Sequence, residues 1–93
     1  MAIVVITTSP DAQVSLQAGV VDDQGVTIIN NTVTRDLTPG GHLFRHTIEG
    51  PVGASCGIKI TQAGVTIKTV GAAGHTIVAG EPDDSIPVSF TVK

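Results

Sequence analysis

The stretch Leu37–Gly53, LTPGGHLFRHTIEGPVG, decides the fold class of this 93-residue chain. It opens with the turn Thr38–Gly41, in which the proline fixes φ and the two glycines accept positive φ at no steric cost. Leu43–Glu49 then has the composition of a β-strand, which a second glycine-proline pair closes. Alternate side chains of a strand share one face. We expect the core face to carry His42, Phe44, His46 and Ile48, with His46 between two apolar neighbours.

Composition favours a sheet-based core. Hydrophobic residues make up 41% of the chain, yet the only aromatic residues of the Phe, Tyr and Trp class are Phe44 and Phe90. Val, Ile, Leu and Ala must therefore fill the core, and β-branched side chains suit a pleated sheet. Charged residues amount to 14%, well below the roughly 25% usual for soluble domains. The length fits one domain, residues 1–93.

Short strands and turn signals alternate along the rest of the chain, and helical periodicity is absent over any window of eleven or more residues. Turns are expected at Asp22–Gly25, Asn30-Asn31 and Gln62–Gly64. The expected strands are Ala2–Thr8, Ala12–Ala18, Val26–Ile29, Thr32–Asp36, Leu43–Glu49, Ser55–Thr61, Val65–Val70, His75–Ala79 and Ser85–Lys93.

Two of these strands carry specific expectations. In Ala12–Ala18 we place Val14 and Leu16 inward and Gln17 outward. In Ser85–Lys93 the residues Ile86, Val88, Phe90 and Val92 alternate with polar ones, and Pro87 lacks an N–H, so this strand should lie at a sheet edge. The pattern predicts an all-β fold of about eight short strands, a small antiparallel β-sandwich of immunoglobulin-like or prealbumin-like type or a small barrel.

A resemblance to known modules supports this architecture. Thr8–Val14, TSPDAQV, followed by Leu37–His42, LTPGGH, and by Gly50, resembles PEGA-type surface modules and the related prealbumin-like sandwiches. The resemblance covers about half of the chain. Where those modules have Gly-Tyr, Gly50 is followed by Pro51. The resemblance implies a non-enzymatic surface or extracellular domain.

Metal binding is the first chemistry to consider. His42 and His46 are four residues apart, which in a strand separates their α-carbons by roughly 13 Å, too far for both to bind one metal. His75 could join either histidine from a neighbouring strand and Cys56 could complete a site, although these residues lack the close spacing of established zinc sites. Calcium prefers oxygen ligands gathered on a loop. The acidic candidates are Asp22, Asp23, Glu81, Asp83 and Asp84.

The only candidate for a catalytic nucleophile is Ser55-Cys56-Gly57, with a histidine elsewhere in the chain as its base. No Gly-x-Ser-x-Gly nucleophile elbow, phosphate-binding loop or dinucleotide-binding fingerprint occurs in the sequence. We therefore expect no enzymatic activity and no cofactor, with Cys56 as a buried strand residue. A net charge of -3 and scattered basic residues exclude nucleic acid as a partner. The absence of Trp and Tyr disfavours carbohydrate binding on aromatic platforms.

Two functional hypotheses follow. The first is a structural, assembly or protein-interaction module, such as a phage, virion or cell-surface component, that forms homo-oligomers or binds a protein through the edge strands Ala2–Thr8 or Ser85–Lys93. The alternative is a module that binds a small ligand or a metal such as calcium or zinc. No segment approaches the roughly 20 apolar residues that span a bilayer. A surface, extracellular or virion-associated location is favoured, despite the free thiol of Cys56.

Overall fold

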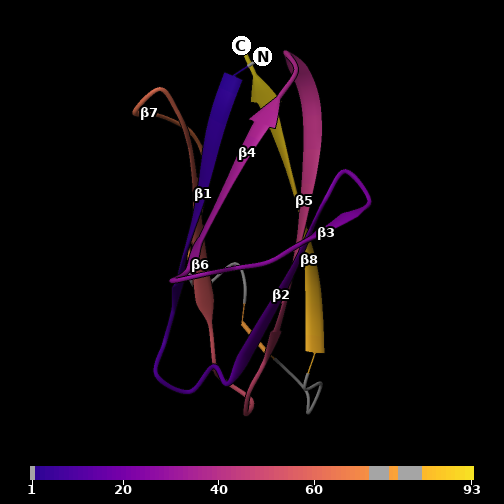
Figure 1. Cartoon of the computed structure of the whole chain (residues 1–93). Coiled ribbons are helices and arrows are strands. Elements are labelled where there is room, and N and C mark those ends of the chain that lie inside the picture. Colours follow the sequence, from indigo (N-terminus) through magenta and orange to yellow (C-terminus); the bar gives the residue numbers. More distant parts are fainter. Residues whose placement is uncertain (1, 72–75, 78–82) are drawn as a thin grey trace.

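Two four-stranded antiparallel sheets pack face to face (Figure 1). The computed structural model describes residues 2–71, 76–77 and 83–93. No helix occurs among these residues, and so none that could cross a membrane. The prediction of a small antiparallel β-sandwich is confirmed. Its strands are β1 (Ala2–Pro10), β2 (Leu16–Val21), β3 (Gln24–Val26), β4 (Thr32–Leu37), β5 (Gly40–Glu49), β6 (Cys56–Gln62), β7 (Val65–Val70) and β8 (Asp83–Val92).

The strand order distinguishes the sandwich from one of its expected types. One sheet has the order β4-β1-β6-β7 and the other β3-β2-β5-β8. In constant-type immunoglobulin domains the first two strands lie in the same sheet. Here β1 and β2 lie in different sheets, so the chain crosses between the sheets at its first connection. The immunoglobulin-like strand order is therefore not the one observed.

Asparagine and aspartate shape two of the three tight turns. Asp22 and Asp23 have φ of 49° and 66°, and Asn30 and Asn31 have φ of 52° and 59°. These left-handed pairs match the type I′ turn, which suits the twist of hairpins and favours Asn and Asp. Ala63 and Gly64 likewise have positive φ between β6 and β7. The three predicted turns are confirmed.

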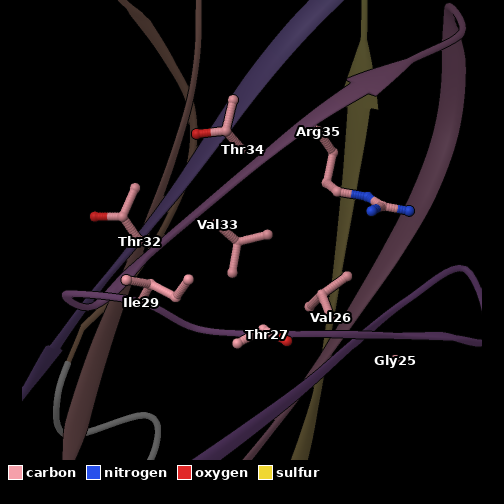
Figure 2. Close-up of a pocket in the computed structure, with 8 residues that line it drawn as sticks. All are labelled: Gly25, Val26, Thr27, Ile29, Thr32, Val33, Thr34 and Arg35. Carbon is pink, nitrogen blue, oxygen red and sulfur yellow. The ribbon is translucent and has the colours of Figure 1, made fainter.

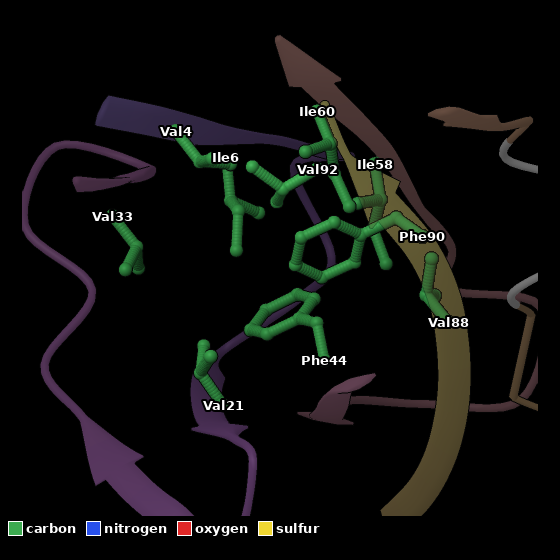
Figure 3. Packing of buried hydrophobic residues seen from close by; sticks show 10 residues of the cluster. All are labelled: Val4, Ile6, Val21, Val33, Phe44, Ile58, Ile60, Val88, Phe90 and Val92. Atoms are coloured by element: carbon green, nitrogen blue, oxygen red, sulfur yellow. The ribbon is translucent and has the colours of Figure 1, made fainter. Parts of the chain in front are cut away.

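The core lies between the sheets and combines both aromatics with branched aliphatic side chains (Figure 3). Phe44 is fully buried, as are His46 and Ile48 on the same face of β5. Val88, Phe90 and Val92 of β8 are buried as their alternation predicts. A smaller cluster at the other end of the sandwich contains Ile48, Ala54, Cys56 and Ile77.

The expected orientation of the second strand is wrong for Leu16 and Gln17, whereas Val14 is half-buried and packs against the smaller core cluster, on the expected side. The strand begins at Leu16, after a turn at Ala12-Gln13, and Leu16 is 55% exposed. The buried face instead carries Gly19 and Val21, together with the half-buried Gln17. Period two holds only within one continuous strand, so the turn before Leu16 cancels the alternation that linked it to Val14.

Of the two strands expected at sheet edges, one lies at an edge and the other does not. β8 is an edge strand, which pairs with β5 alone among the described residues, and Pro87 is accommodated there as predicted. β1, in contrast, lies in the interior of its sheet between β4 and β6. Both of its backbone edges are thus occupied, and the expected edge Ala2–Thr8 is wrong. The expected strand His75–Ala79 lies largely outside the described residues. Its described residue Thr76 forms an isolated bridge with Ser55.

Gly19→Ala should destabilise the fold, because a Cβ at this position would lie 2.9 Å from Cε1 of Phe44 and 3.2 Å from Cγ2 of Val26. Overpacking of this kind costs about 1–3 kcal/mol. We expect a loss of about 1 kcal/mol or more in the free energy of unfolding, measured by urea denaturation. Gly25→Ala is the matched control, since no atom lies within 4 Å of its Cβ position. Equal stability of the two variants would contradict the close packing of Gly19 on Phe44.

Candidate functional site

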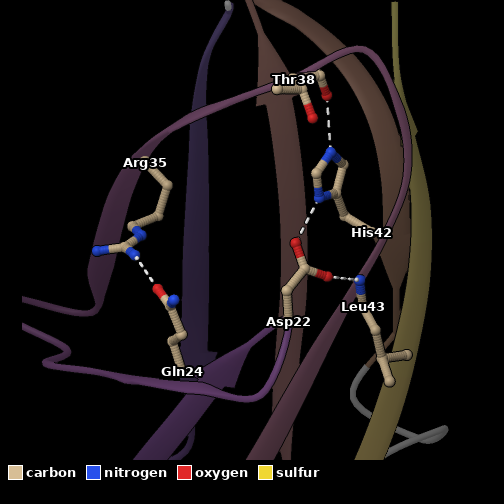
Figure 4. Close-up of polar contacts among 6 residues, drawn as sticks. All are labelled: Asp22, Gln24, Arg35, Thr38, His42 and Leu43. Atoms are coloured by element: carbon tan, nitrogen blue, oxygen red, sulfur yellow. Dashed lines mark hydrogen bonds and ion pairs between the residues drawn. The ribbon is translucent and has the colours of Figure 1, made fainter.

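His42 lies at the start of β5 and bonds through both ring nitrogens (Figure 4). Its Nδ1 lies 2.5 Å from Oδ2 of Asp22, and its Nε2 lies 2.7 Å from the carbonyl oxygen of Thr38. The ring stacks on Phe90, with the centroids 5.8 Å apart. The side chain is only 9% exposed, against 42% for Asp22. We call Asp22, Thr38 and His42 the histidine clamp.

Asp22 is held in place by the backbone of β5. Its Oδ1 accepts a hydrogen bond of 2.9 Å from the N–H of Leu43, and its own N–H donates to the carbonyl oxygen of Leu43 at 2.9 Å. The carboxylate thereby extends the β2–β5 ladder by one step beyond the end of β2. Its second oxygen is left to face His42.

The electrostatics of the clamp favour two opposite charges. Both ring nitrogens face acceptors, so the doubly protonated imidazolium is the form that satisfies both. The hydrogen bond to Asp22 and then that to the Thr38 carbonyl raise the pKa of His42. Partial desolvation opposes ionisation of Asp22, but the hydrogen bonds from His42 and Leu43 outweigh it and lower the pKa of the carboxyl group.

The clamp joins two turns. Asp22 belongs to the turn between β2 and β3, and Thr38 belongs to the connection between β4 and β5. An aspartate–histidine pair also occurs in catalytic triads, where the second nitrogen faces a nucleophile. Here that nitrogen faces a carbonyl oxygen, and an imidazolium that donates from both nitrogens has no lone pair to accept a proton. The arrangement suits structural cross-linking.

His46 forms a second polar group, inside the core. Its ring is fully buried, stacks on Phe44 with centroids 5.5 Å apart, and its Nε2 lies 2.9 Å from Oε1 of Gln17. Gln17 in turn donates from Nε2 to Oδ1 of Asn31 at 2.7 Å. Gln17 thus supplies a partner for a buried polar ring. The sequence did not reveal this role, because the turn before β2 obscures which of its side chains point inward.

In the Ser55-Cys56 candidate for a nucleophile, Cys56 is linked to a histidine only through Gln17, whose Oε1 lies 4.0 Å from the Cys56 Sγ and also bonds Nε2 of His46. Cys56 is fully buried, as predicted, and desolvation raises the pKa of its thiol. The hydroxyl of Ser55 donates to Oδ2 of Asp11 at 3.3 Å, and the Ser55 N–H donates to the same oxygen at 2.8 Å. Asp11 also accepts from the N–H of Gln13, so it fastens the β1–β2 turn to the start of β6.

The remaining predicted ligands do not assemble in the described part of the chain. Asp22 meets His42, while Asp23 lies exposed beside it in the turn. Asp83 and Asp84 begin β8 opposite Glu49 and Ile48, and not in a loop as expected. His75 and Glu81 lie outside the described residues. Among residues 2–71, 76–77 and 83–93, no group of three or more His, Cys, Asp and Glu could hold a metal ion.

A groove of about 560 Å³ opens along β4, on the side of the sandwich where β3 and β4 form the edges (Figure 2). Val33 and Arg35 point to one side of β4 and Thr32 and Thr34 to the other. The lining residues are Gly25, Val26, Thr27, Ile29, Thr32, Val33, Thr34 and Arg35.

The backbone of β4 has hydrogen-bonding groups directed into this groove. Thr32 exchanges both backbone hydrogen bonds with Ile29, away from β1. Because backbone groups alternate in direction along an antiparallel strand, those of Thr34 and Asp36 point the same way as those of Thr32. No strand in the described part of the chain pairs with β4 on that side. Thr34 and Asp36 therefore present unpaired N–H and C=O groups, which we call the free edge of β4.

The other three edges carry features that hinder pairing. β8 contains Pro87, and the Gln62 side chain binds the backbone of Lys93 through both amide atoms, at 2.8 and 3.0 Å. β7 carries Lys68 and lies opposite an irregularity in β6. β3 is three residues long. Sequence reasoning missed the free edge of β4, since strand order determines it and no local pattern encodes strand order.

In the described part of the chain, the fold and these surfaces define a small antiparallel β-sandwich domain with a histidine clamp and the free edge of β4. A scan against protein-family models finds no match, and searches of curated proteins and of solved structures find none either.

The histidine clamp should make stability depend on pH. Because the pKa of His42 is raised above its ordinary 6.5, its stabilisation is complete below that value and is lost as pH rises through the folded pKa. The stabilisation contributed by ionised Asp22, whose pKa is lowered from 3.8, is lost only as pH falls through the pKa of Asp22 in the folded protein. We expect the wild type to lose about 1 kcal/mol or less relative to His42→Gln between about pH 6 and about pH 9, a small figure because Asp22 is partly exposed.

Urea unfolding of both proteins across that range measures the difference, and subtraction removes contributions from His46 and His75. A double-mutant cycle with Asp22→Asn supplies the control, because the charge–charge part of the coupling should vanish where His42 is neutral. A pH-independent difference would contradict the charged clamp.

Gln17→Ala should destabilise the protein by about 1–3 kcal/mol, because the buried ring of His46 loses the acceptor for its Nε2. Gln13→Ala is the matched control, since Gln13 is exposed and, among the described residues, bonds through its backbone N–H and not through its side chain. Thermal unfolding of the two variants measures the difference. A loss in Gln13→Ala as large as that in Gln17→Ala would contradict a specific role for the buried pair.

Proposed function

We propose that this chain is a non-enzymatic assembly or protein-interaction module that accepts an extended strand at the free edge of β4. The observation that carries the proposal is the asymmetry of the edges. Thr34 and Asp36 direct unpaired backbone groups away from β1, those of Thr34 into an open groove, while β8, β7 and β3 carry features that hinder pairing. Strand addition at an exposed edge is a common mode of peptide recognition, with affinity from the main chain.

The shape of the groove supports this use. Val26 and Ile29 line it beside β4, and Ile29 is 65% exposed. A strand added to β4 alternates its side chains between the outer face of the sheet and the groove. Branched apolar side chains of the added strand would contact Val26 and Val33 on the groove side.

The low charge of the surface agrees with such a role. Five basic and eight acidic residues in 93 leave wide areas of Thr, Ser, Ala and Val. A repeated component of a phage, virion or cell-surface structure would use this kind of surface. The resemblance to PEGA-type and prealbumin-like modules stays a prediction that points the same way. The ligand-binding alternative gains no support from the described residues, where no set of metal ligands assembles.

A labelled peptide that copies residues 31–38, NTVTRDLT, tests strand acceptance. We expect fluorescence anisotropy to detect binding to the full chain, and Thr34→Pro to weaken it about tenfold or more. The proline removes an N–H of the free edge and leaves the ladder to β1 intact, because the neighbouring residues Val33 and Arg35 make that ladder.

Ser89→Pro is the matched control. The Lys93 N–H binds Gln62 and so points away from β5, and by alternation the Ser89 N–H points outward as well. This variant should bind the peptide as the wild type does. Absence of binding to the wild type, or equal binding by Thr34→Pro, would overturn the proposed function.

A further inference from the structure

We infer that the strand accepted by β4 is the β4 strand of a second copy of this chain, paired antiparallel about a two-fold axis through Arg35. This inference rests on the proposed function and names its partner. Residues 33–37 of one copy then lie beside residues 33–37 of the other, and two four-stranded sheets become one sheet of eight strands.

The backbone selects the position of the axis. Only Thr34 and Asp36 direct free groups outward, so a symmetric pairing has its axis at Thr34, Arg35 or Asp36. An axis at Thr34 sets Asp36 against Thr32, whose backbone already pairs with Ile29. An axis at Asp36 sets Thr34 against Thr38, whose carbonyl oxygen already bonds His42.

An axis at Arg35 avoids both conflicts. Thr34 of each copy exchanges hydrogen bonds with Asp36 of the other, so all four free residues of the pair are satisfied. Thr32 then falls opposite Thr38, beyond the paired residues, and the Ile29–Thr32 bridge stays clear of the added strand.

The side chains suit this register at four of its five positions. Val33 faces Leu37 of the second copy in pairs without direct hydrogen bonds, where side chains approach most closely. Val33 is buried and Leu37 packs against the same core cluster, so these pairs extend the core of each copy. Thr34 faces Asp36 on the outer side of the sheet.

Arg35 is the one position at which two like charges lie opposite each other, because it faces Arg35 of the second copy. Its Nη2 donates to Oε1 of Gln24 at 3.3 Å, which turns the guanidinium toward the other sheet of its own copy (Figure 4). The remaining like-charge contact weakens the pair and makes it reversible.

The symmetry also limits the assembly. An isologous contact uses the same patch on both copies and closes on itself. Since the remaining edges hinder pairing, the product is a dimer and not a fibre.

Mixing wild-type protein with Arg35→Glu tests the axis directly. Each homodimer sets like charges together, whereas the mixed dimer sets a guanidinium against a carboxylate. At equal concentrations, random pairing gives as many mixed dimers as homodimers, and native mass spectrometry should show this ratio raised about fivefold in favour of the mixed dimer. Arg35→Thr removes the repulsion, so its homodimer should be about threefold tighter than that of the wild type in sedimentation equilibrium. Adding Thr34→Pro to either protein should abolish the dimers, and circular dichroism checks that each variant is folded.

The outcomes separate the two proposals. If the chain binds the peptide but stays monomeric at all concentrations, the inference that a second copy is the partner is wrong, while the proposal that β4 accepts a strand is still supported. A statistical share of the mixed dimer overturns the axis at Arg35. Dimers that persist in Thr34→Pro overturn pairing of the copies through β4, because another surface must then join them.

Discussion

The approach of Phe44 to Gly19 is the contact on which the rest of the sandwich depends. With two phenylalanines in 93 residues, one large ring must fill the centre of the space between the sheets. Gly19 allows it, because any side chain on the neighbouring strand would occupy the volume of the ring. The orientation of β2 follows from this contact, and so does the placement of Gln17, which has to meet the buried His46.

The sequence predicts those parts of the fold that local chemistry controls. The alternation in β8, the core face of β5 and the three tight turns all depend on residues close in the chain, and each agrees with the structure. The orientation of β2 and the interior position of β1 do not follow from local patterns. The first depends on where a turn interrupts a strand, and the second depends on which distant strands pair.

The candidate sites divide along the same line. Sequence reasoning singled out His42, His46 and Asp22, and the structure gives each a specific contact. It did not pair Asp22 with His42, because a strand and a turn bring together residues 20 positions apart. It also assigned the histidines to possible metal binding, whereas His42 bonds an aspartate and a carbonyl oxygen and His46 bonds an amide. The free edge of β4 has no signature in its own six residues, since every strand has the same backbone.

The interior position of β1 has a consequence for synthesis of the chain. β1 is made first, yet its partners are β4 and β6, and its ladder with β6 reaches Gln62. At about 5–20 residues per second, a ribosome needs several seconds to make the residues that separate β1 from its last partner. During this interval the most apolar strand of the chain has no pairing partner on one side. The full pairing of β1 therefore has to wait until β6 has been synthesised.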